Sequence, residues 1–386
     1  MLIYLDNSAT TPLCPEAKRA MLEAMDRFGN PSSLHEEGVA AAALLRDCRV
    51  AIGEALGERY LKDGQLIFTG SGTEASAIAL LGSARAKARR SATTILTTSS
   101  EHPSILQNLA ILEKEGFRVV QMPTKGGVID MEALRPYLNR DLFMVSMMLV
   151  NNETGAWYPV AEVFAAAKAA NPDCVCHCDA VQGFMKVPFS VKSLGADLIT
   201  VSAHKIHGPK GVGALYVSPR MLTTRSLCAV YAGGGQEYGY RSGTENMIGI
   251  AGFAAAARAG VARRTESMRQ TALLSEKLLR ALEGTEIRVN LPAKRAPHIV
   301  SLTLPDIKSE TMLHYLSAKG IAVSSGSACS SHAKTPSGTL IAFGLTPNEA
   351  DCTIRVSLSA ENTEADIDAL VSALCEGVAT LVRIHH

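Results

Sequence analysis

Between residue 66 and about residue 217, short apolar runs alternate with longer segments whose apolar residues recur with helical periodicity. This alternation is typical of an α/β protein in which a parallel sheet carries helices on its faces. Two expected strands, Cys174–Cys178 and Asp197–Ser202, run into polar segments at their carboxyl ends, where open α/β sheets bind ligands. The other elements that we expect here are strands at Leu66–Thr69, Thr94–Thr97, Arg118–Met122 and Met144–Leu149, a helix at Thr73–Arg90 and a helix ending at Leu112.

The pattern changes after Gly249. A long helix rich in Ala, Arg and Leu is expected at Ile250–Glu283, and the elements expected after it are strands at His298–Leu304 and Thr353–Ser359 and a closing helix at Thr363–Val382. A chain of 386 residues suits two or three compact units. We therefore predict a large domain at residues 15–255 and a smaller domain formed by residues 1–14 and 256–386.

Charge and composition limit the kinds of ligand that can be expected. Lysine and arginine number 38 against 37 aspartates and glutamates, a net charge of +1. This balance gives no electrostatic reason to expect nucleic acid or an anionic membrane, so small molecules are the expected ligands. The N-terminus does not resemble a secretory signal, and nine irregularly spaced cysteines do not resemble a disulfide framework. We expect a cytoplasmic protein with reduced thiols.

Lys205 lies just after the strand Asp197–Ser202, in the segment Ser202-Ala203-His204-Lys205. A lysine at a sheet edge can form a Schiff base with an aldehyde cofactor, although an isolated lysine on a turn is more often a surface residue. Asp179, at the end of the preceding strand, favours the cofactor interpretation, because pyridoxal 5'-phosphate (PLP) needs a carboxylate beside its ring nitrogen. Gln182 could donate a hydrogen bond to the phenolate oxygen of the ring.

The turn Gly70-Ser71-Gly72-Thr73 lies between an expected strand and an expected helix. Glycines allow close approach of the backbone, and the start of a helix presents unpaired N–H groups to an anion. The turn therefore suits a phosphate group, although it is neither a Walker loop nor a complete dinucleotide-binding motif.

Together these residues resemble the cysteine desulfurases of the class V aminotransferase group, which are fold type I PLP enzymes. The resemblance runs nearly from end to end and is carried by the segments Tyr4–Pro12, Gly29–Ser33, Glu101–His102, Asn151–Glu153, Ser202–Gly211, Gly233–Glu237, Arg241–Asn246 and Ser324–Cys329. It implies an α/β fold with a mostly parallel seven-stranded sheet in the large domain, a smaller α+β domain, and PLP as the cofactor.

The resemblance also implies roles for individual residues. Lys205 would hold the cofactor, Asp179 would pair with the ring nitrogen, and His102 would stack on the ring face. The phosphate would be bound by Gly72, Thr73, Ser202, His204 and, from a second subunit, Thr244, which implies a homodimer. Gln182 would contact the ring oxygen and Asn152 would lie beside the ring, while Asn7 and Arg355 would bind the substrate carboxylate. No metal site is expected.

Cys329 lies in a run of small residues that is typical of a mobile loop. Without the resemblance, a buried structural thiol would be the favoured interpretation. With it, Cys329 becomes the nucleophile that takes sulfur from L-cysteine and passes it to an acceptor protein, such as an iron–sulfur scaffold or a tRNA-thiolation enzyme. Cys174, Cys176 and Cys178 alternate along one strand, and core packing is favoured there over a soft-metal site.

The implied reaction converts L-cysteine into L-alanine and leaves a persulfide on Cys329. The alternatives are a selenocysteine lyase or another enzyme of the class V aminotransferase fold, and a non-catalytic paralogue that acts as a scaffold. An aminotransferase would not need a cysteine in a mobile loop, and intact Lys205, Asp179 and His102 speak against a non-catalytic protein.

Overall fold

The computed structural model describes residues 2–86, 92–326 and 336–383, and within them seven strands form the main sheet. The strands lie in the order β2-β8-β7-β6-β5-β3-β4, all parallel except β8, which is antiparallel to both neighbours. Their bounds are β2 Leu66–Thr69, β3 Thr94–Thr98, β4 Arg118–Met122, β5 Leu142–Met148, β6 Val175–Asp179, β7 Leu198–Ser202 and β8 Gly213–Val217. The mostly parallel seven-stranded sheet is therefore confirmed.

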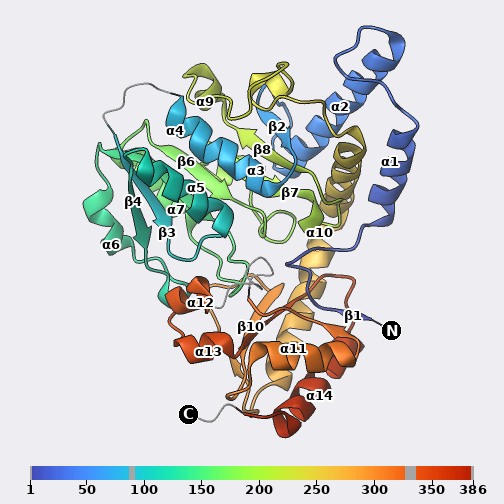
Figure 1. Ribbon diagram of the computed structural model, residues 1–386, viewed down its shortest axis with the longest axis vertical. Helices are drawn as coiled ribbons and strands as arrows, with labels where there is room; N and C mark the ends of the chain where they lie inside the picture. The colour runs from blue at the N-terminus through green and yellow to red at the C-terminus, as the bar shows by residue number, and fades with distance from the viewer. Residues whose placement is uncertain (1, 87–91, 327–335, 384–386) are drawn as a thin grey trace.

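Alternate residues of each strand point to opposite faces of this sheet, and both faces are covered by helices (Figure 1). On one face, Ile67, Ile95 and Val175 pack with helices whose bounds are α3 Gly72–Ala77, the π-helix η1 Ile78–Gly82, α4 Ser83–Arg85 and α5 Pro103–Lys114. On the other face, Phe68 and Leu96 pack with α2 Glu36–Ala55, α7 Val160–Ala170, α8 Val191–Leu194 and the start of α10 Met247–Ala281. The remaining short helices of this part are α1 Pro15–Met25, α6 Met131–Leu134, α9 Pro219–Thr223, and η2 to η5 at Lys125–Gly127, Arg135–Tyr137, Ala203–Lys205 and Glu237–Gly239.

A second core lies below the large sheet in Figure 1. It includes Leu302, Ile354 and Leu370, and it is built around an antiparallel sheet of order β12-β10-β9 and the parallel pair β1-β11. The bounds are β1 Ile3–Tyr4, β9 Arg288–Val289, β10 Ile299–Thr303, β11 Ile321–Ala322, β12 Thr353–Ser357, α11 Ser309–Ala318, α12 Gly338–Phe343, α13 Pro347–Asp351 and α14 Glu364–Thr380. The N-terminal strand therefore joins this core, as the predicted division of the chain into two domains requires.

Helix α10 runs from one core to the other (Figure 1). Its first turns contribute Phe253 and Ala257 to the large core, whereas Leu274 and Leu278 belong to the second core. The sequence predicted this helix at Ile250–Glu283 with a domain boundary near residue 255. Because a single helix is shared, the change from one core to the other occurs within α10.

Three cysteines, two on β6 and one just before it, lie in the large core. Cys174, Cys176 and Cys178 are each 0% exposed and pack on the face of the sheet that α7 covers, opposite His177. Core packing, the favoured interpretation of this sequence pattern, is what the structure shows. Among the described residues, no helix has both the length and the apolar character of a membrane-spanning helix.

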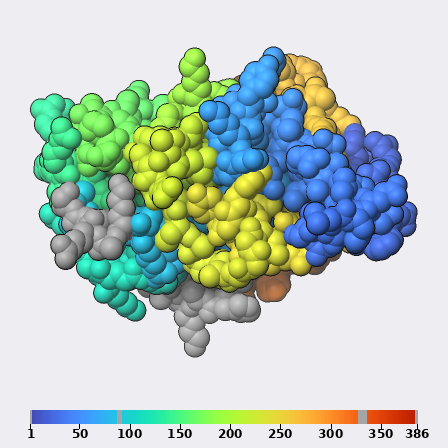
Figure 2. All heavy atoms as spheres, turned by 90° about the horizontal axis from the view of Figure 1, so that it is seen from above, coloured from blue at the N-terminus to red at the C-terminus, as the bar shows by residue number. Residues whose placement is uncertain are grey.

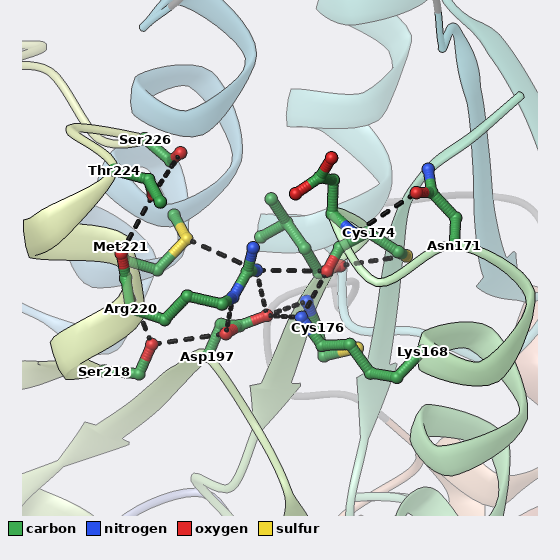
Figure 3. Close-up of polar contacts among 12 residues, drawn as sticks. Lys168, Asn171, Cys174, Cys176, Asp197, Ser218, Arg220, Met221, Thr224 and Ser226 are labelled. Carbon is green, nitrogen blue, oxygen red and sulfur yellow. Dashed lines mark hydrogen bonds and ion pairs between the residues drawn. The ribbon is translucent and has the colours of Figure 1, made fainter. Parts of the chain in front are cut away.

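Asp197 lies at the amino end of β7, the end opposite Ser202. It links this end of β7 to the amino end of β6. Its carboxylate accepts hydrogen bonds from Lys168 Nζ at 2.6 Å, Arg220 Nη2 at 2.7 Å and the Cys176 N–H at 2.9 Å. Figure 3 shows Lys168 and Arg220 reaching Asp197 from opposite sides. Burial alone would raise the pKa of Asp197, but the hydrogen bond from Arg220 and the charge of Lys168 lower it below its usual value.

We expect Asp197→Asn to lower the free energy of unfolding by roughly 3 kcal/mol, because it leaves two partly buried cations without their carboxylate. A folded-state pKa below the unfolded value means that the stabilisation is present at neutral pH and is lost as the pH falls below about 4. Urea unfolding at pH 7 and pH 3.5 measures both effects. The exposed Asp47→Asn on α2 is the control; an equal loss of stability at both pH values in Asp197→Asn would contradict the assignment.

Candidate active site

A cavity of about 190 Å³ opens at the carboxyl ends of the parallel strands. It is lined by ten residues that the sequence singled out: Gly72, Thr73, His102, Asn152, Asp179, Gln182, Ser202, His204, Lys205 and Arg355. It is also lined by residues that the sequence analysis did not assign: Ser8, Ala9, Ser71, Ser104, Met148, Val150 and Val181. The structure therefore brings together side chains from both cores and from the N-terminal segment.

The turn between β2 and α3 forms one end of the cavity. Ser71 is the N-cap of α3, and its Oγ accepts a hydrogen bond from the Glu74 N–H at 3.1 Å. Gly72 and Thr73 follow, so their N–H groups are among those that a helix leaves without an intrahelical acceptor. A Cβ on Gly213 of β8 would lie 2.7 Å from the Ser71 carbonyl carbon and 2.9 Å from the Gly72 nitrogen. Glycine at 213 is therefore what allows β8 to support this anion-binding turn.

Asp179 ends β6 with its carboxylate at the floor of the cavity. It is 6% exposed, and its Oδ1 accepts a hydrogen bond from the Val181 N–H at 3.0 Å. Burial raises the pKa of Asp179 to about 6, although the Val181 N–H and the charge of Lys205 act in the opposite direction. A carboxylate in this setting favours a cationic group beside it.

His177 lies two residues before Asp179 and packs beneath the floor of the cavity. Its ring nitrogens are 2.9 Å from Ser146 Oγ and 3.0 Å from Thr200 Oγ1. Burial lowers the pKa of His177 to about 3, so the imidazole is neutral at physiological pH. His177 therefore acts as a packed, hydrogen-bonded residue that does not line the cavity.

Lys205 lies at the end of η4, on the cavity wall. Its Nζ donates hydrogen bonds to the backbone oxygens of Ser8 at 2.5 Å and Ala9 at 2.8 Å, from a segment almost 200 positions away in the chain. The same N-terminal segment contacts His204, whose Nδ1 is 3.2 Å from Thr10 Oγ1. Burial, together with the charge of Lys205, lowers the pKa of His204 to about 4. The N-terminal segment therefore fixes the position of the lysine.

His102 is the N-cap of α5, and its ring lines the cavity. Its Nδ1 accepts a hydrogen bond from the Ser104 N–H at 3.1 Å and lies 2.9 Å from Ser104 Oγ. Burial and the nearby charge of Lys205 lower the pKa of His102 to about 4. The ring is thus held in one orientation and is neutral at pH 7, as stacking on a planar cofactor requires.

Arg355 of β12 brings the second core into the cavity wall. Its Nη1 donates to the Asn152 backbone oxygen at 2.8 Å and its Nη2 to Asp6 Oδ1 at 2.8 Å, while its Nε has no hydrogen-bond partner among the described residues. Asn7 does not line this cavity. Its Nδ2 donates to the Ser357 backbone oxygen at 2.9 Å, and its side chain lines a second cavity beyond Lys205.

Thr244 is exposed and does not line the cavity of its own chain. It lies in a surface segment, residues 231–246, which Figure 2 shows in yellow beside the blue N-terminal helices. The segment is anchored by Glu237, whose carboxylate receives two hydrogen bonds from Arg49 at 2.7 and 3.0 Å and one from the Phe68 N–H at 2.7 Å. The predicted role of Thr244 in a second subunit's site requires such an exposed position.

Cys329 lies outside the described residues. The described residues that flank it both approach Glu153, the neighbour of Asn152: Ser337 Oγ donates to Glu153 Oε2 at 2.5 Å, and Gly326 packs against the same oxygen. Gly326 has a φ of 67°, which favours glycine. Gly326 and Ser337, described residues on either side of Cys329 in the sequence, therefore both lie against Glu153.

Comparison with known proteins identifies the family of this site. The model of the family described as "Aminotransferase class-V" matches residues 3–370. The chain belongs to the class V aminotransferase family. Class V aminotransferases are PLP enzymes, so the fold type and the cofactor predicted from the sequence are both confirmed.

Within the class V aminotransferases, the chain is similar to proteins named as cysteine desulfurases. It is 36% identical to "Cysteine desulfurase IscS" of Methanosarcina thermophila, over 98% of this chain and 92% of that protein. It is also 36% identical to "Cysteine desulfurase NifS" of Azotobacter vinelandii, over 99% and 94%. A solved structure titled "NIFS-LIKE PROTEIN" superposes with a TM-score of 0.91 at 33% identity, over 99% and 100%. The resemblance drawn from the sequence is therefore confirmed.

The class V cavity of this chain fits PLP. Asp179 offers a buried carboxylate to a protonated ring nitrogen, Lys205 offers an amine for the aldehyde, and the Gly72–Thr73 turn offers N–H groups to the phosphate. A methyl group at Gly72 would approach Val181 Cγ2 to 3.2 Å and Ser202 Cβ to 3.4 Å, so a side chain there would narrow the cavity. The charge of Asp179, the position of Lys205 and the shape of the cavity at Gly72 all suit the cofactor.

Proposed function

We propose that this chain is a PLP-dependent cysteine desulfurase that converts L-cysteine into L-alanine and transfers the sulfur atom to Cys329. The observation that carries the proposal is the convergence of Lys205, Asp179, His102 and the Gly72–Thr73 turn on one cavity. The similarity over nearly the whole chain to relatives named as cysteine desulfurases supports the choice of substrate.

PLP, when bound, supplies a protonated aromatic ring that stabilises negative charge at the α-carbon of the amino acid. Asp179 would keep the ring nitrogen protonated, and the neutral ring of His102 would lie against the cofactor. Lys205 Nζ would hold the cofactor through its aldehyde and would then move the proton at the substrate α-carbon.

Arg355 binds the carboxylate of L-cysteine in this proposal. Among the described residues, the guanidinium uses two of its five N–H donors, in the contacts with Asn152 and Asp6, so donors remain for a carboxylate. The backbone contact with Asn152 links Arg355 to the residue that would lie beside the ring. Asn7 contacts the same region from beyond Lys205, and its predicted role in binding the carboxylate remains part of the proposal.

Cys329 is three residues from Gly326, a span of at most about 11 Å along the chain. Gly326 lies against Glu153, which follows the cavity-lining Asn152 in the sequence, and we propose that Cys329 acts at this cavity. Its thiolate attacks the sulfur of L-cysteine while the carbon–sulfur bond breaks, and the bonding electrons stay with carbon, which takes a proton to give alanine. Cys329 is left as a persulfide, from which an acceptor protein in the cytoplasm would take the sulfur.

A homodimer is part of the same proposal, because Thr244 is predicted to complete the phosphate site of a second subunit. Large apolar side chains are exposed on and between α1 and α2, beside the segment that carries Thr244: Leu22 is 64% exposed, Phe28 82% and Leu34 96%. Exposed apolar residues gathered on one part of a surface are typical of a protein interface.

Turnover of L-cysteine tests the proposal. With a thiol reductant present, we expect the purified holoenzyme to release alanine and sulfide in equal amounts, and Cys329→Ala to lose both by at least about 10²-fold because no other thiol occupies that position. The exposed Cys375→Ala on α14 is the matched control and should match the native protein. The proposal fails if the native protein does not turn over L-cysteine or if Cys329→Ala does so undiminished.

A further inference from the structure

Lys186 lines the second cavity, beside Lys205, and the proposed reaction gives it no role. It follows Met185, whose φ of 63° is a left-handed conformation that is strained for a residue with a side chain. The chain turns back at this point, and Lys186 Nζ donates a hydrogen bond to Gln182 Oε1 at 3.1 Å. Among the described residues Lys186 forms no ion pair, and its polar contact is with the amide oxygen of Gln182.

The charges around Lys186 make this contact unusual. Burial, with the positive charges of Lys205 and Arg355, lowers the pKa of Lys186 to about 7. His207 and His298 line the second cavity together with Lys186, and burial lowers the pKa of both imidazoles, so neither supplies a negative partner for the lysine. A lysine kept among like charges contributes little to stability, which points to a role in the site.

The contact determines which way the carboxamide of Gln182 faces. Below its pKa of about 7 Lys186 is an ammonium group that can only donate, and a backbone carbonyl can only accept. Gln182 Nε2 donates to the Ser8 backbone oxygen at 2.9 Å. Rotating the amide by 180° would place its NH₂ against the ammonium and its oxygen against the carbonyl. The second hydrogen of Nε2 is therefore left for a group in the cavity, which Gln182 lines.

We propose that Lys186 is a positioning residue, which holds the Gln182 carboxamide so that its N–H donates to the phenolate oxygen of bound PLP. The inference rests on the proposed contact between Gln182 and this ring oxygen. An N–H donor stabilises the negatively charged oxygen and so lowers the pH at which the bound cofactor loses its proton.

The pH titration of the visible absorbance of bound PLP, without L-cysteine, tests this inference. We expect Gln182→Leu to raise the midpoint by about one pH unit, the effect of losing one hydrogen bond to a charged oxygen. Lys186→Met should raise it in the same direction, and Lys186→Arg, which keeps the donor, should stay closer to the native value. In the Gln182→Leu background, Lys186→Met should add almost nothing, because both changes remove the same contact.

Two controls separate this effect from general damage. Lys192→Met, at an exposed lysine of α8, should leave the midpoint unchanged, and Lys186→Met should leave the melting temperature of the holoenzyme unchanged or higher. If Lys186→Met does not fold, Lys186→Gln takes its place. An equal shift by Lys186→Met in the native and Gln182→Leu backgrounds, or no shift at all, overturns the inference. An unchanged midpoint in Gln182→Leu alone instead refutes the role proposed for Gln182 and the inference with it, while desulfurase activity is judged separately by alanine release.

Discussion

Lys205→Ala is expected to lower the rate of alanine release from L-cysteine by at least about 10³-fold, because the same amine both tethers the cofactor and moves the proton at the substrate α-carbon. Reduction of the holoenzyme with borohydride, followed by mass spectrometry, should find PLP attached to Lys205 in the native protein. No such adduct should form at this position in the variant.

Lys210→Ala is the matched control, since Lys210 lies in the same segment and is exposed. It should retain native activity and the native adduct. The loss in Lys205→Ala should also occur without unfolding, because the two carbonyls released by the substitution, of Ser8 and Ala9, line a cavity that water can enter. Retention of more than a tenth of the native rate would contradict the assignment of Lys205.

The sheet could be predicted because each buried strand is a short apolar run, which local sequence reveals. Gly213–Val217 was not among the expected strands, and it is the antiparallel one. The predicted helix at Thr73–Arg90 begins at Gly72 and contains the π-helical segment Ile78–Gly82. At the end of this segment the chain packs closely, since a Cβ on Gly82 would lie 2.7 Å from the Cys228 backbone oxygen. No local pattern in the sequence reveals such a contact.

The candidate site also contains residues that the sequence predicted and residues that it missed. Asp179, Lys205 and the Gly72–Thr73 turn end strands or begin helices, so sequence order alone placed them at one sheet edge. Ser8 and Ala9 were missed because contacts between distant segments bring them there. Lys186 was missed although it lies only four residues after Gln182, because the turn at Met185 that brings the two side chains together was not foreseen. The resemblance of Tyr4–Pro12 to the family was the available signal for Ser8 and Ala9, but only Asn7 was taken from it. Asn7 lies beyond Lys205, because its side chain binds the Ser357 backbone oxygen.

The pKa of Asp179 links catalysis to stability. We expect Asp179→Asn to lower the activity of the holoenzyme and to raise the stability of the apoprotein. Asparagine keeps the shape of the side chain but cannot hold a proton on the ring nitrogen, so alanine release should fall by roughly 10²- to 10⁴-fold. Because burial raises the pKa of Asp179 to about 6, above its unfolded value, its ionised form destabilises the apoprotein above that pH. The variant apoprotein should therefore melt at a higher temperature than the native apoprotein at pH 8.

This difference in melting temperature should shrink as the pH falls from about 6 to about 4, where Asp179 becomes protonated in both the folded and the unfolded native protein. Burial raises the pKa of Glu101 to about 8, and the charge of Asp179 raises it as well, so Asp179→Asn also relieves this repulsion and acts in the same direction at pH 8. Asp173→Asn, at an exposed aspartate just before β6, should change neither activity nor the pH dependence. Thermal unfolding of the apoproteins from pH 4 to 8, with activity assays of the holoenzymes, measures both effects. A destabilised Asp179→Asn apoprotein at pH 8 would mean that the carboxylate already has a favourable charge partner without PLP, and that its role as the partner of the ring nitrogen is wrong.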